Sequence, residues 1–235
     1  YATDAVRLAF GNLVTATNSP TPETREAMSR ASHLAGKAIN ITKTTAPHAL
    51  SYALTSRHGV PHGMAVAITL TSMLAFNAEV TDEDCNDPRG ADAVRDRIAR
   101  ILSGLGTDNI EDASASIKSL LTQINCPTTF DSVGIQTSDE LKYIVDSVNA
   151  ERLSNNPRRA SQSQLFHLLQ TIQRNTVTNE HLEASVITCY SLQIETVDYG
   201  LVCTINEDIA EPIVRTVEST TANILSPTLC FLFAF

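Results

Sequence analysis

The chain has 235 residues, of which 43% are hydrophobic and 18% are charged, and its formal net charge at pH 7 is −9. This composition is typical of a folded globular protein and argues against a disordered one. The acidic balance argues against a nucleic-acid-binding surface, and the apolar end of the chain, residues 229–235, is too short to span a bilayer.

Residues 1–173 carry the apolar spacing of helices. The first helix is indicated by four apolar residues between positions 6 and 14. A second helix is predicted to begin after Thr21, because threonine is a good N-cap and Pro22 suits the first helical position. The small side chains of residues 27–38 favour close packing of that helix.

The middle of this region predicts a buried helix followed by an exposed loop. Residues 64–76 are apolar on nearly every side, which is typical of a helix surrounded by protein. Residues 81–91 are rich in acidic and turn-forming residues and predict a loop. The next helix, indicated by the apolar residues of 94–102, is expected to stop at Gly104 and Gly106.

Two capping-box patterns predict the starts of later helices. Asp108 with Glu111 precedes one apolar helical pattern, and Thr137 with Glu140 precedes another. After the break at Pro157, residues 161–173 predict one further helix. The fold class expected for residues 1–173 is therefore mainly α.

After residue 173 the sequence changes character. Residues 186–204 are rich in valine, isoleucine, threonine and tyrosine, which favours strands, and a helix is predicted near 210–223. We therefore expect two regions. Residues 1–173 form an all-helical domain, and 174–235 are an unassigned tail, or the start of a second domain, in which mixed α/β structure stays open.

The five cysteines are scattered, odd in number and without a CxxC pair. This distribution argues against a disulfide framework and against a thiolate metal site. It favours a reducing, cytoplasmic location.

Two histidines, His48 and His62, stand fourteen residues apart. Neutral imidazole is the commonest protein ligand for metals such as iron and zinc. A continuous helix would separate the two by roughly 20 Å, but Gly59 and Pro61 interrupt it. A short helix from His48 to about Leu54, followed by an extended return, allows both rings to reach one ion. Two unrelated histidines remain the alternative, since metal sites usually need three or four protein ligands.

Several stretches of the chain resemble one family of enzymes. They are Arg25-Glu-Ala-Met28, Ala31-Ser-His-Leu-Ala-Gly36-Lys-Ala38, Pro47-His48-Ala-Leu50, Gly59-Val-Pro-His62-Gly63 and Val148-Asn-Ala-Glu-Arg-Leu-Ser-Asn-Asn-Pro157. The sequence resembles the helical C-terminal domain of the iron-containing (group III) alcohol dehydrogenases, whose fold is related to that of dehydroquinate synthase. The resemblance implies that His48 and His62 bind a catalytic Fe²⁺ or Zn²⁺.

The same resemblance implies that parts of the enzyme are not in this chain. The two other metal ligands of the family, an aspartate and a histidine, lie in a motif that has no match ahead of His48. The glycine-rich, Rossmann-like N-terminal domain that binds NAD(P) in the family is likewise expected to be absent. The chain is therefore expected to be a fragment of the enzyme.

The complete enzyme is expected to reduce a short aldehyde with NAD(P)H, with the metal polarising the substrate oxygen. The text around His48 resembles most the phosphonoacetaldehyde reductase branch. Lys37, Lys43 and Arg57 are then candidates for binding the phosphonate, with ordinary solvated cations as the alternative.

His58 and Tyr52 are the candidates for proton transfer. His58 follows His48 on the same predicted segment, and a surface turn residue is its alternative role. Tyr52 stands where many family members have a second histidine, so the role of this position stays open.

Two other functions are consistent with the sequence. One is a catalytically silent helical interaction or structural domain derived from the family, and the other is a dehydroquinate synthase-like lyase. The expected partner is a small alcohol or aldehyde. Nucleic acid and membrane are not expected, and a homo-oligomer stays open.

Overall fold

The computed structural model describes residues 1–173, and the strands and helix predicted within 186–204 and 210–223 lie outside the described residues. The described part is mainly α, as predicted, and its one β-type contact is an isolated antiparallel bridge between Cys85 and Arg158. The elements are α1 (Ala2–Asn18), α2 (Pro22–Thr42), α3 (Ala46–His58), α4 (His62–Ala78), α5 (Ala91–Leu105), α6 (Ile110–Gln123), the 3₁₀ turn η1 (Asp131–Val133), α7 (Ser138–Asp146), α8 (Ala150–Leu153) and α9 (Gln162–Gln173).

Two of the predicted helix starts are confirmed. The hydroxyl of Thr21 accepts a hydrogen bond from the backbone N–H of Thr24, and the backbone N–H of Thr21 donates to the Thr24 hydroxyl at 2.9 Å. Thr137 and Glu140 form the same reciprocal box at the start of α7. Each box satisfies backbone donors that the first turn of a helix leaves without partners.

The capping box predicted for Asp108 and Glu111 is wrong by one residue. The N-cap of α6 is Asn109, whose side-chain oxygen accepts a hydrogen bond from the backbone N–H of Asp112 at 2.8 Å. Asparagine is as good an N-cap as aspartate. Asp112 stands three residues after Asn109, just as Glu111 stands three residues after Asp108.

The predicted glycine stop of α5 is correct at one of its two positions. Gly104 lies inside α5, and the helix ends at Leu105. Gly106 follows in the left-handed conformation, with a φ of 73° that a side chain disfavours.

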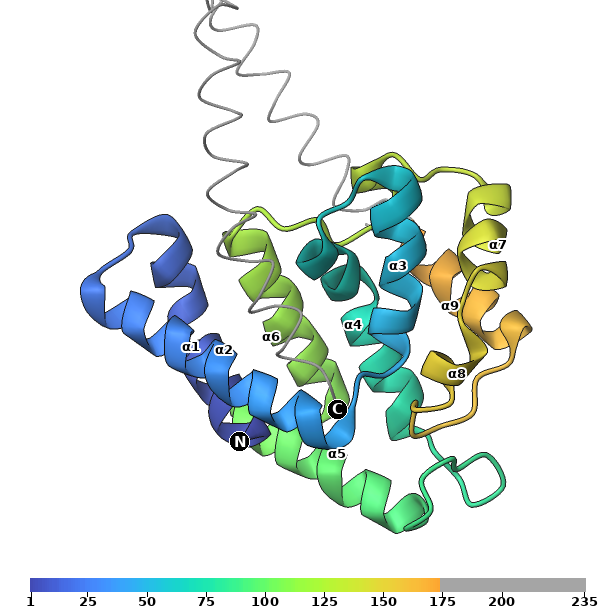
Figure 1. Ribbon diagram of the computed structural model, residues 1–235, viewed down its shortest axis with the longest axis horizontal. Helices are drawn as coiled ribbons and strands as arrows, with labels where there is room; N and C mark the ends of the chain where they lie inside the picture. The colour runs from blue at the N-terminus through green and yellow to red at the C-terminus, as the bar shows by residue number, and fades with distance from the viewer. Residues whose placement is uncertain (174–235) are drawn as a thin grey trace, which may run out of the picture. The chain divides into compact units, whose positions relative to one another are not determined.

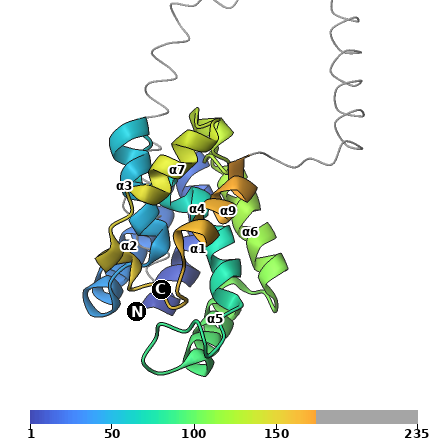
Figure 2. The same cartoon turned by 90° about the vertical axis from the view of Figure 1, so that its right-hand side faces the viewer.

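Helix α4 is the central helix of the described part. It packs against α3, α5, α6 and α9, and Figures 1 and 2 show it among them. Ala67 and Leu70 belong to an apolar cluster that includes residues of α1 and α6. Ile68 and Met73 belong to a second cluster that includes residues of α3, α7 and α9. Because α4 is buried on opposite sides, its sequence is apolar all round, as predicted.

The described residues contain no β-sheet, so a Rossmann-like nucleotide-binding domain does not lie among them. None of the described helices combines the length and the apolar composition that a membrane crossing requires.

Candidate metal and substrate site

Helices α3 and α4 form a hairpin that carries the two histidines. Helix α3 continues to His58, further than the end near Leu54 that the sequence predicts. Gly59 then adopts a left-handed φ of 68° and ends the helix. The return to His62, the first residue of α4, therefore takes only the three residues 59–61.

The hairpin brings the rings of His48 and His62 side by side. Their centroids are 5.6 Å apart, and the ring planes meet edge to face at 68°. His48 is buried, with 4% of its surface exposed, and His62 is half-buried. The two rings therefore lie close together, as the spacing of the two residues allows. Metal binding itself stays a prediction.

Ser51 connects the two histidines, because it lies one helical turn after His48. Its hydroxyl donates a hydrogen bond to the carbonyl oxygen of His48 at 2.8 Å. The hydroxyl oxygen, Ser51 Oγ, also lies 3.1 Å from Nδ1 of His62. A serine hydroxyl has one proton. Since that proton goes to the carbonyl, Ser51 Oγ accepts from the N–H at Nδ1 of His62. The lone pair of this imidazole is then on Nε2, where a metal can bind.

The charge state of His62 also suits a metal ligand. Burial lowers the pKa of His62, because a charged imidazolium is poorly solvated inside protein. Burial therefore favours the neutral ring, which is the form that binds a metal.

The histidine pair is not a complete metal site by itself. Within residues 1–173 no group of three or more histidine, cysteine, aspartate or glutamate side chains is placed to hold one ion. Catalytic zinc sites usually have three protein ligands. The described residues therefore supply at most two ligands to a metal held at this pair.

Tyr52 contacts the pair and is more exposed than either histidine. Its ring centroid is 5.8 Å from that of His62, at an interplanar angle of 40°, and 46% of its surface is exposed. The guanidinium carbon of Arg152 lies 4.1 Å from the centroid of the Tyr52 ring. The structure thus brings together one predicted proton-transfer residue, the histidine pair and an arginine that the sequence did not single out.

The contacts found for Lys37, Lys43 and Arg57, the three cations predicted to bind substrate, are not with the histidine pair. The guanidinium of Arg57 stacks over the ring of Tyr143 at 3.9 Å, and the ammonium of Lys37 lies 5.4 Å from the ring of Tyr1. Lys43 is the exposed C-cap of α2 and has a φ of 64°, a conformation that is costly for a residue other than glycine.

His58 lies in the last turn of α3, and its backbone is ten residues beyond that of His48, which is about 15 Å along a helix. It lies close enough to Glu140, in α7, to affect that carboxyl. The pKa of Glu140 is lowered mainly by hydrogen bonds from Thr137 and from the backbone, and to a small degree by His58. Among the described residues no ring contact joins His58 to the histidine pair.

Asn156 holds the first turn of α3, which carries His48, against α4. Its side-chain oxygen accepts hydrogen bonds from the backbone N–H of Ala46 at 3.4 Å and from Asn77 of α4 at 3.3 Å. Its NH₂ group donates to the Asn77 side chain at 2.8 Å and to the carbonyl of Arg158 at 2.7 Å. Only 1% of Asn156 is exposed, so this network is buried.

Sequence reasoning missed Ser51, Arg152 and Asn156. Ser51 could have been found, since a residue three positions after His48 shares its face of a helix. The other two lie about a hundred residues after α3, and no local pattern connects them to it.

A cavity of about 560 Å³ lies next to the site but does not include it. Its lining includes Thr45 and Pro47 from the start of α3, Leu70 of α4 and Asn156, and neither histidine of the pair. The metal site therefore cannot be assigned to this cavity.

Comparisons with known proteins identify the family. Residues 1–173 match the model of the Fe-containing alcohol dehydrogenase family, C-terminal. The chain is 33% identical over 170 residues to a phosphonoacetaldehyde reductase of Streptomyces viridochromogenes, a match that covers 72% of this chain and 42% of that protein. It is 31% identical over 185 residues to a sulfoacetaldehyde reductase of Bilophila wadsworthia, covering 72% of this chain and 44% of that protein.

Solved structures agree with this assignment. A sulfoacetaldehyde reductase from Bifidobacterium kashiwanohense in complex with NAD⁺ has a TM-score of 0.62 and 27% identity, covering 74% of this chain and 43% of that one. A 1,3-propanediol oxidoreductase has the same fold, with a TM-score of 0.62 at 24% identity over 72% of this chain and 44% of that one. The chain spans less than half the length of these relatives. The resemblance seen in the sequence is confirmed, and the chain belongs to the Fe-containing alcohol dehydrogenase family.

Proposed function

We propose that this chain is the metal- and substrate-binding part of an NAD(P)-dependent aldehyde reductase. The substrate is a short aldehyde with an anionic group, and phosphonoacetaldehyde is the first candidate because a relative named for it is 33% identical to this chain. The arrangement of His48, Ser51 and His62 is the observation that carries the proposal. It presents two imidazoles side by side, with the free nitrogen of one fixed by a buried hydroxyl.

The residues present fit a divalent metal ion. His48 and His62 would hold Fe²⁺ or Zn²⁺, since imidazole suits both ions. When bound, the ion supplies Lewis-acid polarisation of a carbonyl oxygen. Because the described residues hold no larger ligand cluster, the proposal requires further ligands from outside them. The nicotinamide nucleotide also requires a binding site outside residues 1–173.

Proton transfer is assigned to the two candidates of the sequence, with Tyr52 first. The phenol of Tyr52 is on the exposed side of the pair, where a substrate would enter, and its ring contacts that of His62. His58 is the second candidate. Lys43, Lys37 and Arg57 remain proposed contacts of the substrate anion, although the last two already stack on aromatic rings.

Metal binding by the full 235-residue chain tests the proposal. Zn²⁺, and Fe²⁺ without oxygen, would be titrated into the purified chain by isothermal calorimetry. His62→Ala is expected to raise the dissociation constant at least about tenfold, because a direct ligand matters no less than its supporting residues. His167→Ala, on the exposed side of α9, is the matched control and should have no effect. Equal affinity in all three proteins would contradict the proposal and favour the catalytically silent domain.

A further inference from the structure

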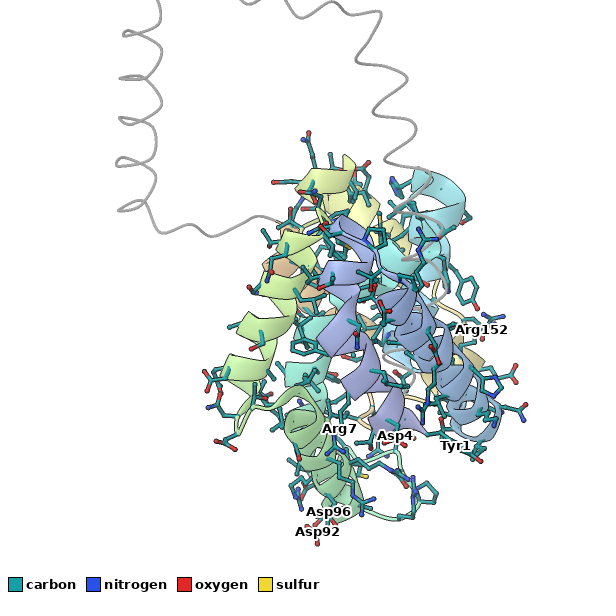
Figure 3. All side chains as sticks on the ribbon, turned by 90° about the vertical axis from the view of Figure 1, so that its left-hand side faces the viewer. Tyr1, Asp4, Arg7, Asp92, Asp96 and Arg152 are labelled. Atoms are coloured by element: carbon teal, nitrogen blue, oxygen red, sulfur yellow. The ribbon has the colours of Figure 1, made fainter. Side chains whose placement is uncertain are left out.

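Arg152 is connected to the histidine pair through one aromatic ring. The ring of Tyr52 contacts His62 on one side, with 5.8 Å between centroids. The guanidinium of Arg152, from α8, lies over the same ring at 4.1 Å. Arg152 is exposed, and Figure 3 labels it at the edge of the drawn ribbon. A positive charge therefore lies over the aromatic ring that contacts His62.

The hydrogen-bonding capacity of Arg152 is available. A guanidinium stacked on a ring uses its face and keeps its N–H groups at the edge. Among residues 1–173 no carboxylate forms an ion pair with Arg152, a property that it shares with Arg57 and several other arginines but not with Arg158. A fork of donors without a carboxylate partner matches the oxygens of a phosphonate or a sulfonate.

The backbone of Arg152 is fixed relative to the pair. Its N–H donates to the side-chain oxygen of Asn149, the N-cap of α8, at 3.0 Å. Four residues later, Asn156 is hydrogen-bonded to the first turn of α3 and to α4. The segment that carries Arg152 is therefore attached to both helices that carry the histidines.

Arg57 offers a comparison on the same protein. It also stacks on a tyrosine, with its guanidinium 3.9 Å from the centroid of the Tyr143 ring. The described structure gives that tyrosine no contact with a histidine ring. The difference between the two arginines is thus their connection to the histidine pair.

We infer that Arg152 binds the anionic group of the substrate and so selects anionic over neutral short aldehydes. This inference rests on the proposed function, and it assigns to Arg152 the role for which the sequence offered Lys37, Lys43 and Arg57. Stacked on Tyr52, the guanidinium would hold the phosphonate or sulfonate at the entrance. The carbonyl carbon at the other end of the molecule would then face the histidine pair.

The test uses the full chain and two alcohols of similar size. One is 2-hydroxyethylphosphonate, the alcohol that reduction of phosphonoacetaldehyde yields, and the other is the neutral 1,3-propanediol. Binding would be measured by calorimetry with and without Zn²⁺. Arg152→Gln should weaken binding of the phosphonate at least about tenfold, because a hydrogen bond between charged groups is lost. Arg152→Lys should weaken it less. Arg30→Gln, at an exposed position of α2, should leave the affinity for the phosphonate unchanged, and Arg152→Gln should not change the binding of 1,3-propanediol.

A second measurement needs no variant. In the wild-type chain, the ¹⁵N–¹H signal of the Arg152 side chain should shift on addition of 2-hydroxyethylphosphonate. The inference is overturned if the wild type does not bind the phosphonate, or if Arg152→Gln leaves its affinity unchanged. Dependence on Arg152 without zinc supports the inference even if His62→Ala does not alter metal binding. If His62→Ala loses metal binding but Arg152→Gln binds the phosphonate as well as the wild type does, the proposed function stands and this inference is wrong.

Discussion

The hydroxyl of Ser51 determines which nitrogen of His62 is available, because its single proton is already used by the carbonyl of His48. In a metal site, such a supporting hydrogen bond fixes the tautomer and the orientation of the ligand. Ser51 is completely buried, so water cannot easily replace its hydroxyl. The residue would thus support His62 as a metal ligand without being a ligand itself.

Replacing Ser51 tests this role directly. Ser51→Ala is expected to lower the affinity of the chain for Zn²⁺ by about 10- to 100-fold. In the metal-free protein, ¹⁵N spectra of the imidazoles should show His62 with its proton on Nδ1 in the wild type, and loss of that preference in the variant.

Two further variants separate this effect from general damage. Ser51→Thr keeps a hydroxyl and should retain the tautomer, whereas Ser56→Ala makes the same change at an exposed position of α3 and should change neither measurement. An unaltered His62 tautomer in Ser51→Ala would show that the serine does not set it.

At the scale of elements, the segment after α8 is hydrogen-bonded to the first turn of α3. Asn156 makes its hydrogen bonds to three different segments inside the protein. Removing the side chain leaves several of these buried groups without partners, and each such group costs about 1–3 kcal/mol. The position of His48 in the first turn of α3 therefore depends on a residue far away in the sequence.

Asn156→Ala is expected to lower the free energy of unfolding by about 2–4 kcal/mol. Urea denaturation followed by circular dichroism would measure it. Asn155→Ala is the matched control, because within the described part the side chain of Asn155 makes no hydrogen bond, and we expect less than about 0.5 kcal/mol there. A similar loss of unfolding free energy in both variants would mean that the hydrogen bonds of Asn156 do not stabilise the fold.

Local patterns in the sequence predicted most helices but not every boundary. The box at Thr137 and Glu140 was correct because no rival pattern adjoins it. At α6 two overlapping patterns compete, and the sequence alone does not decide between Asp108 and Asn109 as the cap.

The same limit applies to the candidate site. The pairing of His48 with His62 followed from the family motif and from the breakers between them. The contacts of Arg152 and Asn156 depend on the packing of segments that are distant along the chain, and no spacing rule reports such packing.

At the scale of the described domain, α4 contributes to two apolar clusters at once. Neither cluster can lose α4 and remain packed, so residues 1–173 are expected to unfold as one cooperative unit. Cys126 belongs to one of these clusters and can report on that unfolding.

The thiol of Cys126 should react with iodoacetamide only after unfolding. Burial raises the pKa of Cys126 to about 12, and the thiolate is the reactive form. At pH 8 only about one molecule in 10,000 would carry the thiolate in the folded state, compared with roughly a quarter when the pKa is normal. Peptide mapping by mass spectrometry across a urea series should give a labelling midpoint that coincides with the loss of helix.

The half-buried Cys85 serves as the internal comparison and should be labelled before Cys126. Labelling of Cys126 at urea concentrations that leave the helices intact would instead show that the segment after α6 opens locally.

The two-sided burial of α4 has a consequence for anyone who wishes to alter the substrate range. A randomised library directed at α4 would mostly yield collapsed or insoluble variants, because each of its sides is already committed to packing. Arg152 is exposed, and its replacement is expected to disturb packing far less. Directed evolution of new specificities should therefore begin at Arg152 and leave α4 untouched.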